Sequence, residues 1–171
     1  MRFRVFLITG LLAVSTAGLQ AGDRCDYSGG WTLNEEKSEL NDMGTQFLPL
    51  EVAIRQEGND FTITKIFEGQ YGDEMHIEEI LTLDGKECKS EFWNSPRVTT
   101  AAFSQDGKAL TVSSKIAFNR DGAESIMTVN EILTLSEDGK ILKIKHHSNS
   151  DWGERVVTMV FDKAVAESKA K

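Results

Sequence analysis

Hydrophobic and polar residues alternate along most of the chain from residue 50 onward, which is typical of β-strands with one buried and one solvated face. Val52 and Ile54, for example, alternate with Glu51, Ala53 and Arg55. Helical spacing appears only near residues 35–42, after Asn34 as a candidate cap. The pattern predicts strands near residues 29–33, 50–55, 61–67, 75–83, 86–93, 97–104, 110–118, 126–135, 141–147 and 155–161.

Two stretches of the chain are nearly copies of one another. Met75–Leu83 reads MHIEEILTL and Met127–Leu135 reads MTVNEILTL. The flanking segments also correspond, including a Gly-containing turn before and after each copy. A repeat of about 50 residues that is built from strands and tight turns indicates that one antiparallel meander occurs twice in the chain.

A long meander with one apolar face is most simply closed into a barrel, because closure removes the exposed edges. The expected fold class is therefore all-β, a single antiparallel up-and-down β-barrel of about 8–10 strands. The barrel domain is expected to span residues 22–162, followed by a tail at 163–171. Following the strands up and down places the tight turns at one end, the floor. The longer loops and the segment 34–49 fall at the other end, the mouth.

The first 21 residues are expected to be a secretory signal peptide. A basic start (residues 1–4) precedes an apolar run (residues 5–18), and Ala21 ends a workable cleavage site. The run is too short to cross a bilayer, which disfavours the alternative of a membrane anchor. We therefore expect an exported protein, periplasmic or extracellular, with no membrane span after cleavage.

Charge narrows the range of partners. Without residues 1–21 the chain has 17 Lys and Arg against 27 Asp and Glu, a net charge of −10. Such an acidic surface argues against nucleic acid and anionic membranes as partners. A monomer is expected.

The start of the predicted barrel carries a family resemblance. Gly29, Trp31, Leu33, Asn34 and Ser38 form the opening Gly-x-Trp-x-Leu-Asn-x-x-x-Ser, and Asp-Gly-Lys hairpins follow at 84–86, 106–108 and 138–140. With a signal peptide before it and a meander after it, this opening resembles small secreted bacterial lipocalin-like proteins of the calycin superfamily. The resemblance implies a lumen that binds a small, mostly apolar or amphipathic molecule.

Two carboxylates interrupt the inward face at equivalent positions of the repeat. An unpaired Glu79 or Glu131 in a dry core would be unfavourable and its pKa would rise. Three interpretations remain open. Both residues line a wet lumen and anchor a polar or cationic ligand group; or Glu79 pairs with the inward Lys65; or a β-bulge turns both outward and puts Ile80 and Ile132 inside.

Further candidates for ligand binding lie towards the mouth. Arg97 and Arg155 are repeat-equivalent and could hold a carboxylate or phosphate, or could simply be solvated rim residues. The other inward candidates, which either bind an apolar ligand or plug the barrel, are Phe67, Phe118, Met75, Met127, Phe92 and His146. In an open lumen the two glutamates should share one depth, with the two arginines nearer the mouth. A ligand would then place an amine or hydroxyls deep and an acidic group outward.

No pattern in the sequence indicates catalysis or metal binding. His146 and His147 point to opposite faces of a strand, and no nucleophile elbow, HExxH motif or phosphate-binding loop occurs. We expect no metal, no cofactor and a binding protein rather than an enzyme. The alternative function is a filled barrel that binds or inhibits another envelope protein through loops 68–74, 119–124 and 148–153.

The chain contains two cysteines, Cys25 and Cys88, and the topology places both at the floor. In an exported protein this arrangement predicts a disulfide. A buried free thiol at the inward Cys88 is the alternative.

Overall fold

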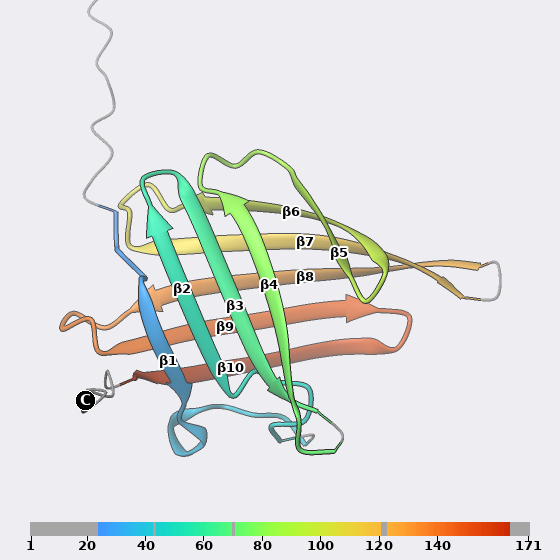
Figure 1. Ribbon diagram of the computed structural model, residues 1–171, viewed down its shortest axis with the longest axis horizontal. Coiled ribbons are helices and arrows are strands. Elements are labelled where there is room, and N and C mark those ends of the chain that lie inside the picture. The colour runs from blue at the N-terminus through green and yellow to red at the C-terminus, as the bar shows by residue number, and fades with distance from the viewer. Residues whose placement is uncertain (1–23, 43, 70, 121–122, 165–171) are drawn as a thin grey trace, which may run out of the picture.

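The computed structural model describes residues 24–164 apart from residues 43, 70, 121 and 122. The described residues form ten β-strands and one 3₁₀-helix, η1 (Glu35–Lys37). The strands are β1 (Gly29–Leu33), β2 (Glu51–Glu57), β3 (Asp60–Glu68), β4 (Glu74–Thr82), β5 (Cys88–Phe92), β6 (Ser95–Phe103), β7 (Ala109–Arg120), β8 (Ala123–Leu135), β9 (Ile141–Ser150) and β10 (Gly153–Lys163) (Figure 1). The predicted all-β, up-and-down architecture is confirmed.

The strands form one antiparallel sheet that curls into a nearly closed barrel (Figure 1). Its order is β4-β3-β2-β1-β10-β9-β8-β7-β6-β5, so consecutive strands of the chain pair with one another except β4 and β5, and β1 pairs with β10. In the described part of the chain, β4 and β5 are the two edges and no ladder joins them. Near the floor, Asp84 forms an isolated bridge with Ala102, and Gly85 N–H donates to Ala101 O at 3.0 Å. The barrel therefore has one seam, between β4 on one side and β5 and β6 on the other.

The hydrophobic core fills the floor half of the barrel. Tyr27, Trp31, Phe61 and Leu133 are almost fully buried there. Tyr27 Oη donates to Leu133 O at 2.8 Å, and Trp31 Nε1 donates to Tyr27 O at 3.1 Å. Burial raises the pKa of the Tyr27 phenol well above its usual value. Trp31 belongs to the predicted first strand, whereas Tyr27 precedes every predicted strand.

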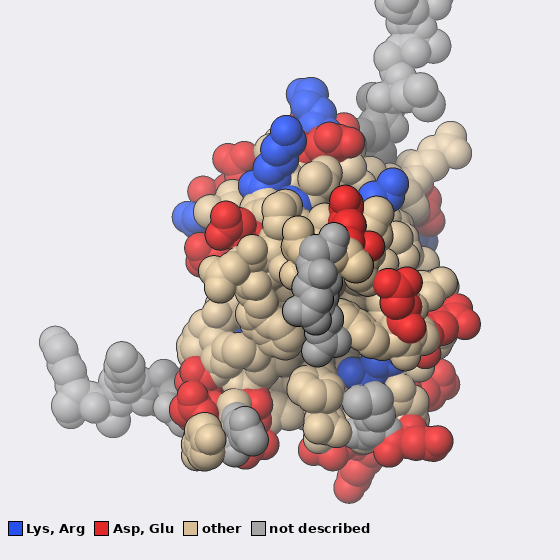
Figure 2. Space-filling model, turned by 90° about the vertical axis from the view of Figure 1, so that its right-hand side faces the viewer, with Lys and Arg blue, Asp and Glu red and all other residues tan. Residues whose placement is uncertain are grey.

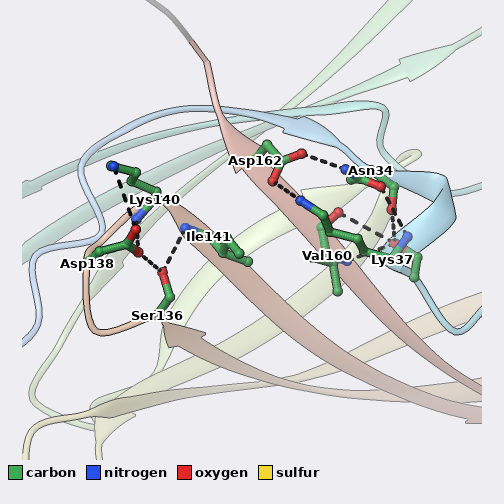
Figure 3. A network of polar contacts seen from close by, with 9 residues as sticks. Asn34, Lys37, Ser136, Asp138, Lys140, Ile141, Val160 and Asp162 are labelled. Atoms are coloured by element: carbon green, nitrogen blue, oxygen red, sulfur yellow. Dashed lines mark hydrogen bonds and ion pairs between the residues drawn. The ribbon is translucent and has the colours of Figure 1, made fainter.

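The Asp-Gly turns of the floor fold as their sequence predicts. At 136–140 the Ser136 hydroxyl donates to Asp138 Oδ1 at 2.6 Å, which also accepts from Lys140 N–H at 3.2 Å, and Ile141 N–H donates to Ser136 Oγ at 3.0 Å (Figure 3). Gly139 has φ +66°, which a residue with a side chain rarely adopts. The turn at 104–109 repeats this bonding pattern. These bonds lower the pKa of each turn aspartate, the hydroxyl donor contributing most.

The predicted helical segment is shorter than expected. Asn34 caps η1 by accepting from Lys37 N–H at 3.1 Å, and both residues also contact Asp162 on β10 (Figure 3). The helix stops because the chain turns to pair with β10: Val160 N–H donates to Ser38 Oγ at 2.9 Å, and the next residue forms a bridge to the same strand. Backbone pairing here outcompetes further helical turns.

The predicted disulfide is absent, because Cys25 and Cys88 both carry free thiols. Cys25 N–H donates to Gly107 O at 3.0 Å in the β6–β7 turn. The Cys88 sulfur instead accepts from Thr82 N–H at 3.4 Å, across the β4–β5 turn. Each cysteine is held by a different floor turn, so sharing one end of the barrel does not bring their sulfurs together.

The predicted strands 86–93 and 97–104 leave a turn at 94–96, but Trp93 and Asn94 form this turn and Ser95 and Pro96 already pair in β6. The expected signal peptide and most of the tail lie outside the described residues. Among the described residues, no helix is long and apolar enough to span a bilayer.

Candidate functional site

The mouth half of the barrel encloses a cavity of about 1070 Å³ above the packed floor. Its wall consists of the inward faces of strands on both sides of the barrel together with the 45–50 segment. Every residue that the sequence analysis proposed for ligand binding lies on this wall: Glu79, Glu131, Arg97, Arg155, Phe67, Phe118, Met75, Met127, Phe92 and His146. Their role in binding stays a prediction, but the strands do bring them together around one space.

The pairing register of the strands explains why apolar side chains lie next to one another on the cavity wall. Phe67 faces Met75 across β3 and β4, and Ile116 faces Met127 across β7 and β8. Phe118 lies one inward position closer to the mouth on β7. The two halves of the repeat therefore supply corresponding Met side chains to the cavity, whereas the counterpart of Phe67 is Ile116.

The first polar cluster is centred on Glu79, which is 6% exposed. Its carboxylate forms an ion pair with Arg97, also 6% exposed, and Thr99 Oγ1 donates to Glu79 Oε1 at 2.8 Å. Because the Thr99 proton is engaged there, the Ser114 hydroxyl donates to Thr99 Oγ1 at 2.9 Å. Arg97 Nε donates to Ser90 Oγ at 3.2 Å. Four strands thus contribute to one bonded group.

The second polar cluster is centred on Glu131, also 6% exposed. Lys65 Nζ donates to both carboxylate oxygens, at 2.7 and 2.5 Å, and His146 Nδ1 lies 3.1 Å from Oε1. Burial acts most strongly and would raise the pKa of Glu131. The charge of Lys65 and the contacts of His146 together outweigh burial and hold that pKa well below its usual range. Glu131 is therefore ionised and paired.

These contacts decide between the three interpretations of the glutamates. Both face the lumen, and Ile80 and Ile132 are 68% and 36% exposed, so the bulge is excluded. Pairing of Lys65 with Glu79 is wrong, because Lys65 reaches across the lumen to Glu131 while Glu79 pairs with Arg97. Both acids already have basic partners. The argument for a ligand amine deep in the lumen therefore no longer holds.

Arg155 differs from its repeat equivalent Arg97. Arg97 is buried, so its alternative interpretation as a solvated rim residue is wrong. Arg155 Nη2 donates to Gln46 O at 2.9 Å, and its buried Nε has no hydrogen-bond partner. No carboxylate forms an ion pair with it among the described residues. Burial lowers the pKa of the Arg155 guanidinium, as expected for a cation that loses water without gaining an anion.

Sequence reasoning missed several residues of the cavity. Thr99 and Ser114 were not proposed as partners of Glu79. Phe47, Trp93 and Trp152 line the cavity on the mouth side and were not proposed at all. The available signal was position, because each of these aromatics lies in a connection that the up-and-down order places at the mouth.

Comparison with known proteins gives a fold-level likeness. No known protein-family profile matches the chain, and no curated protein matches it in sequence. The chain is similar to the zebrafish ileal bile acid-binding protein, whose crystal structure contains cholic acid. The TM-score is 0.49 at 16% identity, over 81% of this chain and 98% of that protein. Membership of the lipocalin or calycin superfamily stays a prediction.

Proposed function

We propose that this protein binds a small amphipathic molecule in the mouth half of its barrel. The observation that supports the proposal is the cavity of about 1070 Å³, lined by Phe and Met side chains around a few fixed polar groups. Ligand sites in proteins usually have volumes of roughly 300–1,000 Å³ and this mixture of residues. A barrel filled with side chains, on which the interaction or inhibitor module depends, would lack such a space.

The charges of the wall indicate the polarity of the ligand. At mid-depth the two glutamates are neutralised by Arg97 and Lys65, so that level suits hydroxyl or carbonyl groups rather than a net charge. Nearer the mouth, Arg155 has no carboxylate partner among the described residues, and its buried Nε can still donate a hydrogen bond. We infer that the ligand carries an acidic group, bound by Arg155, on an apolar body that contacts the Phe and Met wall.

The test is a comparison of three ligands with the same alkyl chain: dodecanoate, dodecanol and dodecylamine. Their affinities are measured by displacement of the fluorescent probe 1-anilinonaphthalene-8-sulfonate. The acid should bind best, and Arg155→Gln should weaken acid binding about tenfold while leaving the alcohol nearly unchanged. Arg55→Gln removes an exposed arginine of the outer face and should change neither affinity. Equal affinity of the three ligands would contradict the role of Arg155, and binding of none of them would contradict a hydrophobic lumen.

We further propose that the protein is exported and works in the periplasm or outside the cell. The pattern of residues 1–21 supports this proposal: a basic start, a short apolar run and a small residue before the cleavage site.

A further inference from the structure

The mouth of the barrel presents one large exposed aromatic side chain from each of four connections. Phe47 lies between η1 and β2, Tyr71 between β3 and β4, Trp93 between β5 and β6, and Trp152 between β9 and β10. They are 63%, 91%, 59% and 62% exposed. We refer to these four residues as the aromatic rim. The chain's third tryptophan, Trp31, is by contrast buried at the floor.

The rim is continuous with the cavity wall. Trp93 stacks on Phe92 with ring centroids 4.7 Å apart, and Trp152 packs against Phe118 at 5.6 Å. Phe92 and Phe118 line the cavity, as do the inner sides of both tryptophans. The two tryptophan rings of the rim are therefore supported from below by aromatic residues of the cavity wall.

Two rim residues have backbone conformations that are unfavourable for aromatic residues. Phe47 has φ +62° and Trp93 has φ +47°, in the left-handed region that bulky side chains rarely adopt. Trp93 and Asn94 are the two central residues of the β5–β6 turn, where asparagine and glycine are usual. Strain of this kind is characteristic of functional positions. Folding alone would be served better by a small residue at Trp93.

The charged residues next to the rim aromatics in sequence are acidic, and the nearest base along the chain is Arg155, which donates to Gln46 O beside Phe47. Asp73, Glu91, Asp151 and Glu154 lie within two residues of a rim aromatic and are exposed, and no Lys or Arg lies that close in sequence. Figure 2 shows the side of the molecule on which the β9–β10 turn lies, with uncharged residues over much of its centre, Asp and Glu around them, and Lys and Arg gathered mainly at the top of the view. An exposed apolar surface of this kind indicates an interaction site, and the carboxylates select its partner.

We propose that the aromatic rim docks on a phospholipid surface whose headgroups carry an ammonium group, such as phosphatidylcholine. Trp and Tyr rings reside preferentially at the boundary between headgroups and acyl chains, where the apolar ring and the polar N–H or O–H are both satisfied. Ammonium groups bind both to aromatic faces and to the four carboxylates. Anionic lipids would be repelled by the same carboxylates. The docked orientation directs the mouth of the cavity towards the bilayer.

The experiment measures flotation of the ligand-free protein with phosphatidylcholine vesicles, and quenching of its tryptophan fluorescence by lipids brominated in the acyl chains. The wild type should float and be quenched, and addition of phosphatidylglycerol to the vesicles should weaken binding. Trp93→Ala and Trp152→Ala should each reduce vesicle binding about tenfold. Ile80→Ala removes an equally exposed apolar side chain from the flank of β4 and should have no effect.

Tyr71→Ala is a rim substitution that should not disturb folding, because a side chain that is 91% exposed contributes little to the stability of the fold. It should also weaken vesicle binding. The proposal is overturned if the wild type does not bind phosphatidylcholine vesicles, if phosphatidylglycerol strengthens binding, or if Ile80→Ala has the same effect as the rim substitutions. A protein partner, the other class of occupant for an aromatic rim, would give the first of these results. Because no lumen ligand is present, the outcome does not depend on the proposed binding function.

Discussion

Glu131 and Glu79 occupy the same position of the repeat, yet they are neutralised by different routes. Glu79 is held by a guanidinium and a threonine hydroxyl, and Glu131 by an ammonium and an imidazole. In each case the carboxylate is buried and its partners come from other strands. Such pairs matter most when one partner is removed, because the remaining charge then lies in a site with little water.

Glu131→Gln should lower the free energy of unfolding by about 3 kcal/mol near neutral pH, because Lys65 loses its buried counterion. The effect should depend on pH with a definite sign. The folded pKa of Glu131 is depressed, so its contribution is fully present above the unfolded value of 4.5 and is lost as pH falls below that value. Urea unfolding of both proteins from about pH 6 to about pH 3 should therefore show the difference shrinking.

Glu78→Gln is the control, because Glu78 is exposed on the outer face of β4. It should leave the stability unchanged throughout that pH range. An increase in stability for Glu131→Gln at neutral pH would instead mean that desolvation exceeds the attraction between Glu131 and Lys65.

At the scale of elements, the seam between β4 and the β5–β6 hairpin is the weak point of the barrel. No ladder joins β4 to β5 in the described part of the chain, so side chains must hold this side together. Glu79 on β4 contacts both Arg97 and Thr99 on β6, and this cluster lies at mid-depth along the seam. Glu79, one of the two glutamates whose role the sequence left open, therefore helps to close the barrel at this seam.

Thr99→Val should open this seam locally. The substitution keeps the shape of the side chain but removes the hydrogen bond to Glu79 and the acceptor for Ser114. The loss should lower the free energy of unfolding by about 1–2 kcal/mol. Hydrogen exchange followed by mass spectrometry should show faster exchange in β4 and β5, with β8, β9 and β10 unchanged. Thr100→Val, at the neighbouring position on the opposite face, should alter neither region. Uniformly faster exchange across all strands would argue against a seam.

At the scale of the whole molecule, the period-two pattern was enough to predict the strands, their faces and the two ends of the barrel. Contacts across the lumen were not predictable in this way. Lys65 and Glu131 lie on β3 and β8, which are not neighbours in the sheet, so their meeting depends on how tightly the sheet curls. Tyr27 was missed because a single aromatic before the first strand has no periodicity. The prediction of a disulfide was wrong, because two cysteines at the same end of a barrel need not have their sulfurs in contact.

Export is a property of the whole molecule, because removal of residues 1–21 would change the net charge of the mature protein. Cleavage after Ala21 would remove two arginines and no acids, which takes the net charge from −8 to −10. Intact-mass measurement of the protein recovered from the cell envelope or medium should give the mass of residues 22–171. Ala21→Arg should block processing, because the cleavage site requires a small residue at that position. A recovered mass that still includes residues 1–21 would show that they are not a cleaved signal, whereas the barrel and its cavity would be unaffected.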